Sequence, residues 1–229
     1  MIGSKLLLVT ITGSMMAIGP APAVLASDTG ACQRTPTREG RQSWKEVIAK
    51  QLHNHDPANA AQGARLAAEI IDDNAAAVVT DIHSGVNPNA TLKLAGGDMT
   101  LLELAVAACN EDISRELVGL GASPDGLGTS VPIVTAGAKG DASTVEFLIQ
   151  HGAKVDKQDS AGHTALEDAV RQHKLGAVKV LLKYDADVNR GLAGGATILD
   201  LASNSQDPTD KAIADELTSH GAVRGARQD

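Results

Sequence analysis

One six-residue pattern recurs along the C-terminal part of this 229-residue chain. It ends in alanine and mostly begins with threonine, and its copies are Thr100–Ala105, Val131–Ala136, Thr164–Ala169 and Thr197–Ala202. The final alanines lie 31, 33 and 33 residues apart. Self-similarity at a period of about 20–50 residues indicates a repeat architecture, in which each unit buries its apolar face only against its neighbours.

A second marker follows each copy at a nearly constant distance. It is a Gly-Ala or Asp-Ala pair that starts at Gly121, Gly152, Asp185 and Gly221. The first three pairs start 16 residues after the alanine of their pattern, and the fourth starts 19 residues after it. We therefore expect four units of one design, with extra residues in a turn of the last.

These units resemble ankyrin repeats, which consist of a turn and two antiparallel helices and open with Thr-Pro-Leu-His-x-Ala. The best match opens at Gly162–Ala169, continues with a second helix at Ala177–Leu182 and leads through Asp185–Asn189 into the next finger loop. The sequence departs from the family where histidine is replaced, by Glu103, Val134, Glu167 and Asp200, and only Pro132 keeps the proline. The resemblance implies an all-α ankyrin-repeat solenoid of helix-turn-helix units with hairpin-like fingers.

The resemblance implies that residues 43–229 form one ankyrin-repeat domain, a stack of repeats with a capping helix. Residues 97–223 hold the clear repeats, and residues 58–96 form a degenerate unit with helices at 58–71 and 75–82. A capping box at Ser43–Glu46 predicts the start of an N-terminal capping helix within residues 43–57. Trp44 in this helix is expected to cover the core rather than to bind a partner.

The N-terminus has the features of an export signal. Lys5 precedes the apolar run Leu6–Ile18, and the small residues of Val24–Ala26 predict cleavage after Ala26. Residues 1–26 are thus predicted to be a signal peptide, and residues 27–42 a flexible leader. The apolar run is too short to span a bilayer, so we expect a soluble periplasmic or secreted protein without membrane insertion after cleavage.

Export makes the two cysteines relevant. An oxidising compartment permits a Cys32–Cys109 disulfide, which would tie the leader to the body. Two free thiols are the alternative.

Composition and charge exclude some partners. The net charge is −8 and aromatic residues make up 1%, so anionic lipid and nucleic acid are poor partners for this chain. A protein partner is expected.

No catalytic or metal-binding motif is found. His53 and His55 form the sole metal-like pair, but residues two apart point to different sides of a helix. Glu167 and Asp168 are expected to be solvated, with no pocket that would shift their pKa values. We therefore expect no catalytic residue, no metal ligand and no cofactor.

The candidate partner-binding residues belong to the fingers and to the first helices. From the fingers they are Asn87, Asn89, Asp125, Leu127, Lys157, Gln158, His163, Arg190 and Leu192, and from the first helices Lys139, Arg171, Gln172 and Asn204. Leu127 and Leu192 are the leading candidates, because an apolar side chain on a glycine-rich tip has no evident core to enter. Either could instead fold back onto its own hairpin.

The resemblance favours a protein–protein interaction module. The chain resembles small exported bacterial ankyrin-repeat proteins that act as immunity-type inhibitors and neutralise a toxic secreted effector enzyme. The alternative is an accessory scaffold in envelope or oxidative-stress tolerance. A hydrolytic enzyme is disfavoured because the motifs are missing.

Overall fold

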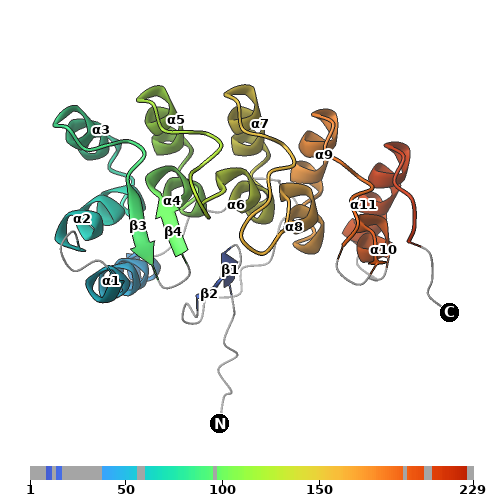
Figure 1. Ribbon diagram of the computed structural model, residues 1–229, viewed down its shortest axis with the longest axis horizontal. Coiled ribbons are helices and arrows are strands. Elements are labelled where there is room, and N and C mark those ends of the chain that lie inside the picture. Colours follow the sequence, from blue (N-terminus) through green and yellow to red (C-terminus); the bar gives the residue numbers. More distant parts are fainter. Residues whose placement is uncertain are drawn as a thin grey trace, which may run out of the picture.

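The computed structural model describes residues 9–11, 14–16, 38–55, 60–94, 97–192, 195–203 and 208–225. From α2 onward its helices lie in pairs, side by side in one row (Figure 1). The pairs are α2 (Ala60–Ile71) with α3 (Ala75–His83), α4 (Leu101–Ala107) with α5 (Glu111–Gly119), α6 (Pro132–Lys139) with α7 (Ala142–Gln150), α8 (Ala165–Arg171) with α9 (Leu175–Lys183), and α10 (Ile198–Ser203) with α11 (Pro208–Ser219). The predicted all-α solenoid is thereby confirmed.

The first helix of each clear unit starts where the repeated pattern starts. Thr100, Thr164 and Thr197 accept hydrogen bonds through their hydroxyl oxygens from the backbone N–H three residues on, at 3.1–3.3 Å. Such a bond satisfies a backbone donor that has no partner inside the helix. In α6 the cap is Val131, which has no such side-chain bond, and Pro132 takes the first helical position.

The alanine that ends each pattern marks the close contact between neighbouring units. Ala105, Ala136 and Ala169 are completely buried, and Ala202 is almost so. Next to Ala136, a Cβ atom on Gly137 would lie 2.6 Å from the backbone oxygen of Ala165 in α8. Small residues at these positions therefore let the backbones of successive first helices approach closely.

In the first four helix pairs, the turn between the two helices contains one residue of positive φ. These residues are Asp73, Cys109, Gly140 and His173, with φ between 56° and 76°. In three of the turns, the next residue caps the second helix with its side chain: Asn74, Asn110 and Asp141. Cys32 lies outside the described residues, so the Cys32–Cys109 disulfide stays a prediction.

The finger before α4 is a β-hairpin of β3 (Thr91–Leu94) and β4 (Gly97–Thr100), paired antiparallel with Thr91 opposite Thr100. Two further strands, β1 (Val9–Ile11) and β2 (Ser14–Met16), pair with each other inside the predicted signal peptide. The rest of that segment lies outside the described residues. In the described ranges, no helix combines the length and apolar character needed to cross a membrane.

The N-terminal helix α1 (Arg38–His55) packs on α2 and buries Trp44, Ile48 and Leu52. It begins five residues before the predicted Ser43, which therefore lies inside the helix and does not cap it. Two basic side chains of the helix approach the turn after α2: Lys45 lies 2.8 Å and Arg41 4.0 Å from the carboxylate of Asp72. Part of the predicted leader is thus helical.

Candidate functional site

A set of finger residues connects each unit to the next, and we call Asn89, Asp125, Asp156 and Asn189 the inter-unit acceptors. The side-chain Oδ1 of each accepts the backbone N–H of a residue in the following unit, at 2.7, 3.1, 3.0 and 2.9 Å respectively. Asn89 and Asn189 also donate from Nδ2 to the carbonyl oxygens of Gly121 and Gly221. These bonds fix the fingers relative to one another.

Several predicted partner-binding residues therefore bond within the stack. Beyond Asn89 and Asp125, Asn87 accepts the N–H of Asn89 at 2.9 Å, and Lys157 donates to the carbonyl oxygen of Asp125 at 2.6 Å. Arg190 donates to the carbonyl oxygen of Gly162 at 2.8 Å. Their contact with a partner stays a prediction, but they already act as structural residues.

Among the predicted partner-binding residues of the first helices, some contact other residues of the stack and others are exposed. The Lys139 ammonium lies 5.8 Å from the centre of the Trp44 ring, and burial together with Lys174 lowers its pKa. Arg171 donates to Glu167 at 2.6 and 3.2 Å. Gln172 is exposed, as is Gln158 in its finger. Asn204 lies outside the described residues.

The two leading apolar candidates differ. Leu127 is 42% exposed at its finger, whereas Leu192 packs half-buried against the core. Leu192 thus folds back onto the protein, and its backbone N–H donates to Ala196 across its loop.

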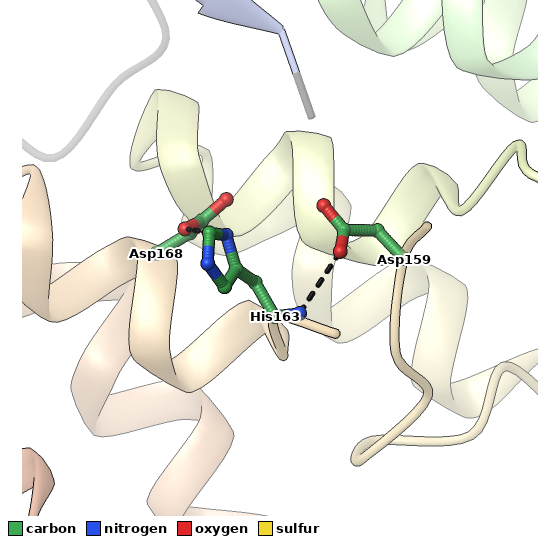
Figure 2. Close-up of side chains that lie close together, drawn as sticks. All are labelled: Asp159, His163 and Asp168. Carbon is green, nitrogen blue, oxygen red and sulfur yellow. Dashed lines mark hydrogen bonds and ion pairs between the residues drawn. The ribbon is translucent and has the colours of Figure 1, made fainter. Parts of the chain in front are cut away.

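One cluster of chemically active side chains lies where the finger ahead of α8 meets that helix: Asp159, His163 and Asp168 (Figure 2). The Oδ1 atom of Asp159 accepts the backbone N–H groups of Ala161 and His163, both at 2.9 Å. These bonds curl the finger so that Asp159 faces the start of α8. His163 directly precedes the capping Thr164, and Asp168 lies one turn into the helix.

The charges in this cluster face one another closely. Nδ1 of His163 lies 3.5 Å from Oδ1 of Asp168, and its Nε2 lies 3.7 Å from Oε1 of Glu167. Burial, above all, raises the pKa of Asp168 to about 6, while His163 opposes the shift and Asp159 and Glu167 add to it. The expectation of solvated carboxylates is therefore wrong for Glu167, which is 4% exposed, and the expectation of an unshifted pKa is wrong for Asp168.

Sequence reasoning placed His163 on a finger and Asp168 in a helix but did not bring in Asp159. The missing information is the turn of the finger, because only its backbone hydrogen bonds return Asp159 to His163. The one local signal for that turn is Gly162, which adopts a φ of 84° three residues after Asp159. A glycine at this place indicates a turn but does not indicate a metal site.

Comparison with known proteins identifies the repeats. A family model described as ankyrin repeats (3 copies) matches residues 102–191 and 133–222, which together span more than half of the chain. An ankyrin-repeat protein of Rickettsia bellii is 26% identical over 50% of this chain and 44% of its own length.

Two larger proteins match over smaller shares of their length. Human SH3 and multiple ankyrin repeat domains protein 2 is 31% identical over 65% of this chain and 8% of its own length. A glycerophosphocholine phosphodiesterase of Schizosaccharomyces pombe is 37% identical over 39% of this chain and 8% of its own length. The chain thus spans less than half the length of each of these relatives.

Proposed function

Because this chain belongs to the ankyrin-repeat family and its repeats form a protein–protein interaction module, we propose that it is an exported inhibitor of a toxic secreted effector enzyme. Inhibition of this kind needs a rigid surface that covers the enzyme and requires no chemistry of its own. The inter-unit acceptors support this proposal, since they hold successive fingers in fixed positions before any partner arrives.

The observation that carries the proposal is the exposure of Leu127. Among the described residues, Leu127 and Val223 are the large apolar side chains that stand exposed, at 42% and 58%. Leu127 sits on a finger whose backbone is held by the bond between Asp125 and Lys154. An apolar side chain that stays exposed on a fixed finger gains free energy when a partner removes it from water.

The proposal is tested by measuring the affinity of the purified protein for an effector encoded beside its gene. We expect Leu127→Lys to weaken binding at least about tenfold, the effect of losing about 1.4 kcal/mol. Val223→Lys is the matched control, because it places the same charge on the other exposed apolar position and should leave binding unchanged.

Two outcomes would contradict inhibition. One is that the protein binds no effector from neighbouring genes. The other is that a deletion strain becomes sensitive to peroxide but not to the effector, a result that would favour the accessory scaffold.

Export and the disulfide form part of the proposal and have their own tests. Sequencing of the N-terminus of the protein from the host's periplasm should show cleavage after Ala26. Peptide mapping without reductant should show a peptide that joins Cys32 to Cys109, and this peptide should disappear on reduction.

We also propose that the chain has no catalytic activity of its own. The phosphodiesterase of S. pombe shares only a stretch equal to 8% of its length with this chain, so its name carries little weight for activity. Incubation with glycerophosphocholine should yield no product, and turnover that is lost in Asp168→Asn would contradict this.

A further inference from the structure

Asp159 carries a buried oxygen that no donor among the described residues satisfies. The residue is 7% exposed. Its Oδ1 accepts two backbone N–H groups, whereas its Oδ2 has no hydrogen-bond partner in the part of the chain that the structure describes. Figure 2 shows this free oxygen on the side of the carboxylate that faces His163 and Asp168. A buried carboxylate oxygen without a donor is costly, so the geometry leaves a place for a positive group.

The spacing of the three side chains suits one metal ion. One ligand atom from each of Asp159, His163 and Asp168 lies within 4.8 Å of the others. Zinc binds imidazole nitrogen and carboxylate oxygen at about 2.0–2.2 Å in a tetrahedron, so two of its ligands stand about 3.3–3.6 Å apart. Binding therefore requires the three ligand atoms to come closer by up to about 1.5 Å.

The surroundings of His163 resemble those of a metal-binding histidine, with a carboxylate 3.7 Å from its second ring nitrogen, a distance longer than a hydrogen bond. Nδ1 of His163 faces Asp168, and Nε2 faces Glu167. If Nδ1 binds the metal, Nε2 is the ring nitrogen that carries the proton. A histidine ligand commonly donates its other N–H to a carboxylate, which orients the ring. Arg171 holds that carboxylate of Glu167 with two bonds.

The charges also favour a dication. Asp159, Glu167 and Asp168 bring three carboxylates to this end of α8, and the Arg171 guanidinium is engaged by Glu167. A divalent ion between the other two carboxylates would offset both of their charges at once.

We propose that Asp159, His163 and Asp168 bind one divalent transition-metal ion of the zinc class. Three protein ligands leave at least one coordination position for water or for a ligand from outside. The site does not depend on the proposed inhibitor function, because its ligands all come from this chain.

The test is calorimetric titration of Zn²⁺ into the purified protein after treatment with EDTA and dialysis, without reductant. We expect one ion per chain. Asp159→Asn and His163→Gln should each weaken Zn²⁺ binding at least about 100-fold. Loss of a residue that only hydrogen-bonds to a ligand already costs up to about 100-fold, and loss of a ligand itself should cost no less. Glu167→Gln should weaken Zn²⁺ binding about tenfold, since this residue only orients His163.

His173→Gln is the matched control. His173 lies 2.6 Å from Asp210 and so forms another histidine–carboxylate pair, but it belongs to no three-ligand cluster among the described residues. Its variant should bind Zn²⁺ like the unaltered protein. Circular dichroism verifies that each variant folds, and Asp159→Asn retains the Oδ1 acceptor of the finger. Absence of Zn²⁺ binding, or equal affinity in His163→Gln and the unaltered protein, would overturn the proposal.

Discussion

The helices α4 and α8 start at equivalent threonines, Thr100 and Thr164, yet the residues around their first turns differ in chemistry. The residue before the threonine is Met99 in one unit and His163 in the other. The fourth residue after the threonine is Leu104 in α4 and Asp168 in α8. In the α4 unit, the side chains of Met99 and Leu104 are both buried and apolar. Because α4 shows that apolar side chains fit the stack at both positions, the fold does not require the polar pair of α8. This difference favours a binding role for that pair.

The buried carboxylates of the two helices show the same contrast. Glu103 in α4 accepts hydrogen bonds from the hydroxyl groups of Ser130 and Thr135, which belong to the next unit. Glu167, at the same position of α8, instead bonds to Arg171 in its own helix. One carboxylate thus connects two units, and the other stays within its own helix, 3.7 Å from Nε2 of His163.

Removal of the two carboxylates should give the largest difference between these units. We expect Glu103→Ala to lower the free energy of unfolding by about 3 kcal/mol, because two buried hydroxyl groups lose their acceptor. Glu167→Ala should cost about 1 kcal/mol, since Arg171 is 42% exposed and can turn to water. Urea denaturation measures both losses, and equal losses would contradict the contrast.

The α8 unit should also respond to pH. In the folded protein the pKa of Asp168 rises from 3.8 to about 6, so folding favours its protonated form. Its contribution to stability is therefore greatest below pH 3.8, falls as the pH rises to about 6 and stays low above that. Asp168→Asn removes this loss and should stabilise the metal-free protein by up to about 3 kcal/mol at pH 7.

Thermal unfolding in EDTA at pH 4 and pH 7 measures this effect. The gain from Asp168→Asn should appear at pH 7 and nearly vanish at pH 4, where the unaltered protein also carries a neutral side chain. A gain of the same size at both pH values would show that the charge is not its cause.

The helix α6 between the two units offers a third comparison. Its Gly137 occupies the position of Val106 in α4, but a Cβ atom there would meet the backbone of Ala165. Gly137→Ala should therefore destabilise the protein by about 1–3 kcal/mol. Gly119→Ala is the control, since no atom lies within 4 Å of its added Cβ, and it should be neutral or slightly stabilising in urea denaturation.

The smallest effect is expected at the marker after each second helix. Gly121 follows α5 with a φ of 98°, whereas Asp185 follows α9 with a φ of 59°, a region that favours glycine. Asp185→Gly should stabilise the protein by up to about 1 kcal/mol in thermal unfolding. The reverse change in an equivalent place, Gly152→Asp, should lower stability, and a gain there would contradict the explanation.

The row of helix pairs could be predicted because the nearly constant repeat length places the buried alanine of every unit, and the capping threonine of three of them, at equivalent positions in the stack. The beginning of α1 could not be predicted from its own sequence, since the contact of Arg41 with Asp72, in the turn between α2 and α3, is visible only in the structure. The cluster was missed for a similar reason. Its third member comes from a finger whose path depends on backbone hydrogen bonds, and local sequence does not show them.

The inter-unit acceptors could have been found in the sequence. Asp125, Asp156 and Asn189 each stand four residues after the marker of their unit, so the regular position of an acceptor was visible. Their role depended on the donors of the following unit, which only the structure provides.

The inter-unit acceptors give the stack a direction. Every one of them bonds toward the C-terminus, so the two ends of a shortened stack would differ chemically. Removing units from the C-terminal end leaves a side-chain oxygen without its donor, whereas removing them from the N-terminal end leaves a backbone N–H without its acceptor. An extra unit inserted between α9 and α10 would need two groups to bond to both of its neighbours. The first is a backbone N–H after its marker, for the acceptor of the preceding unit, and the second is an acceptor side chain two residues further on, for the N–H of the following unit.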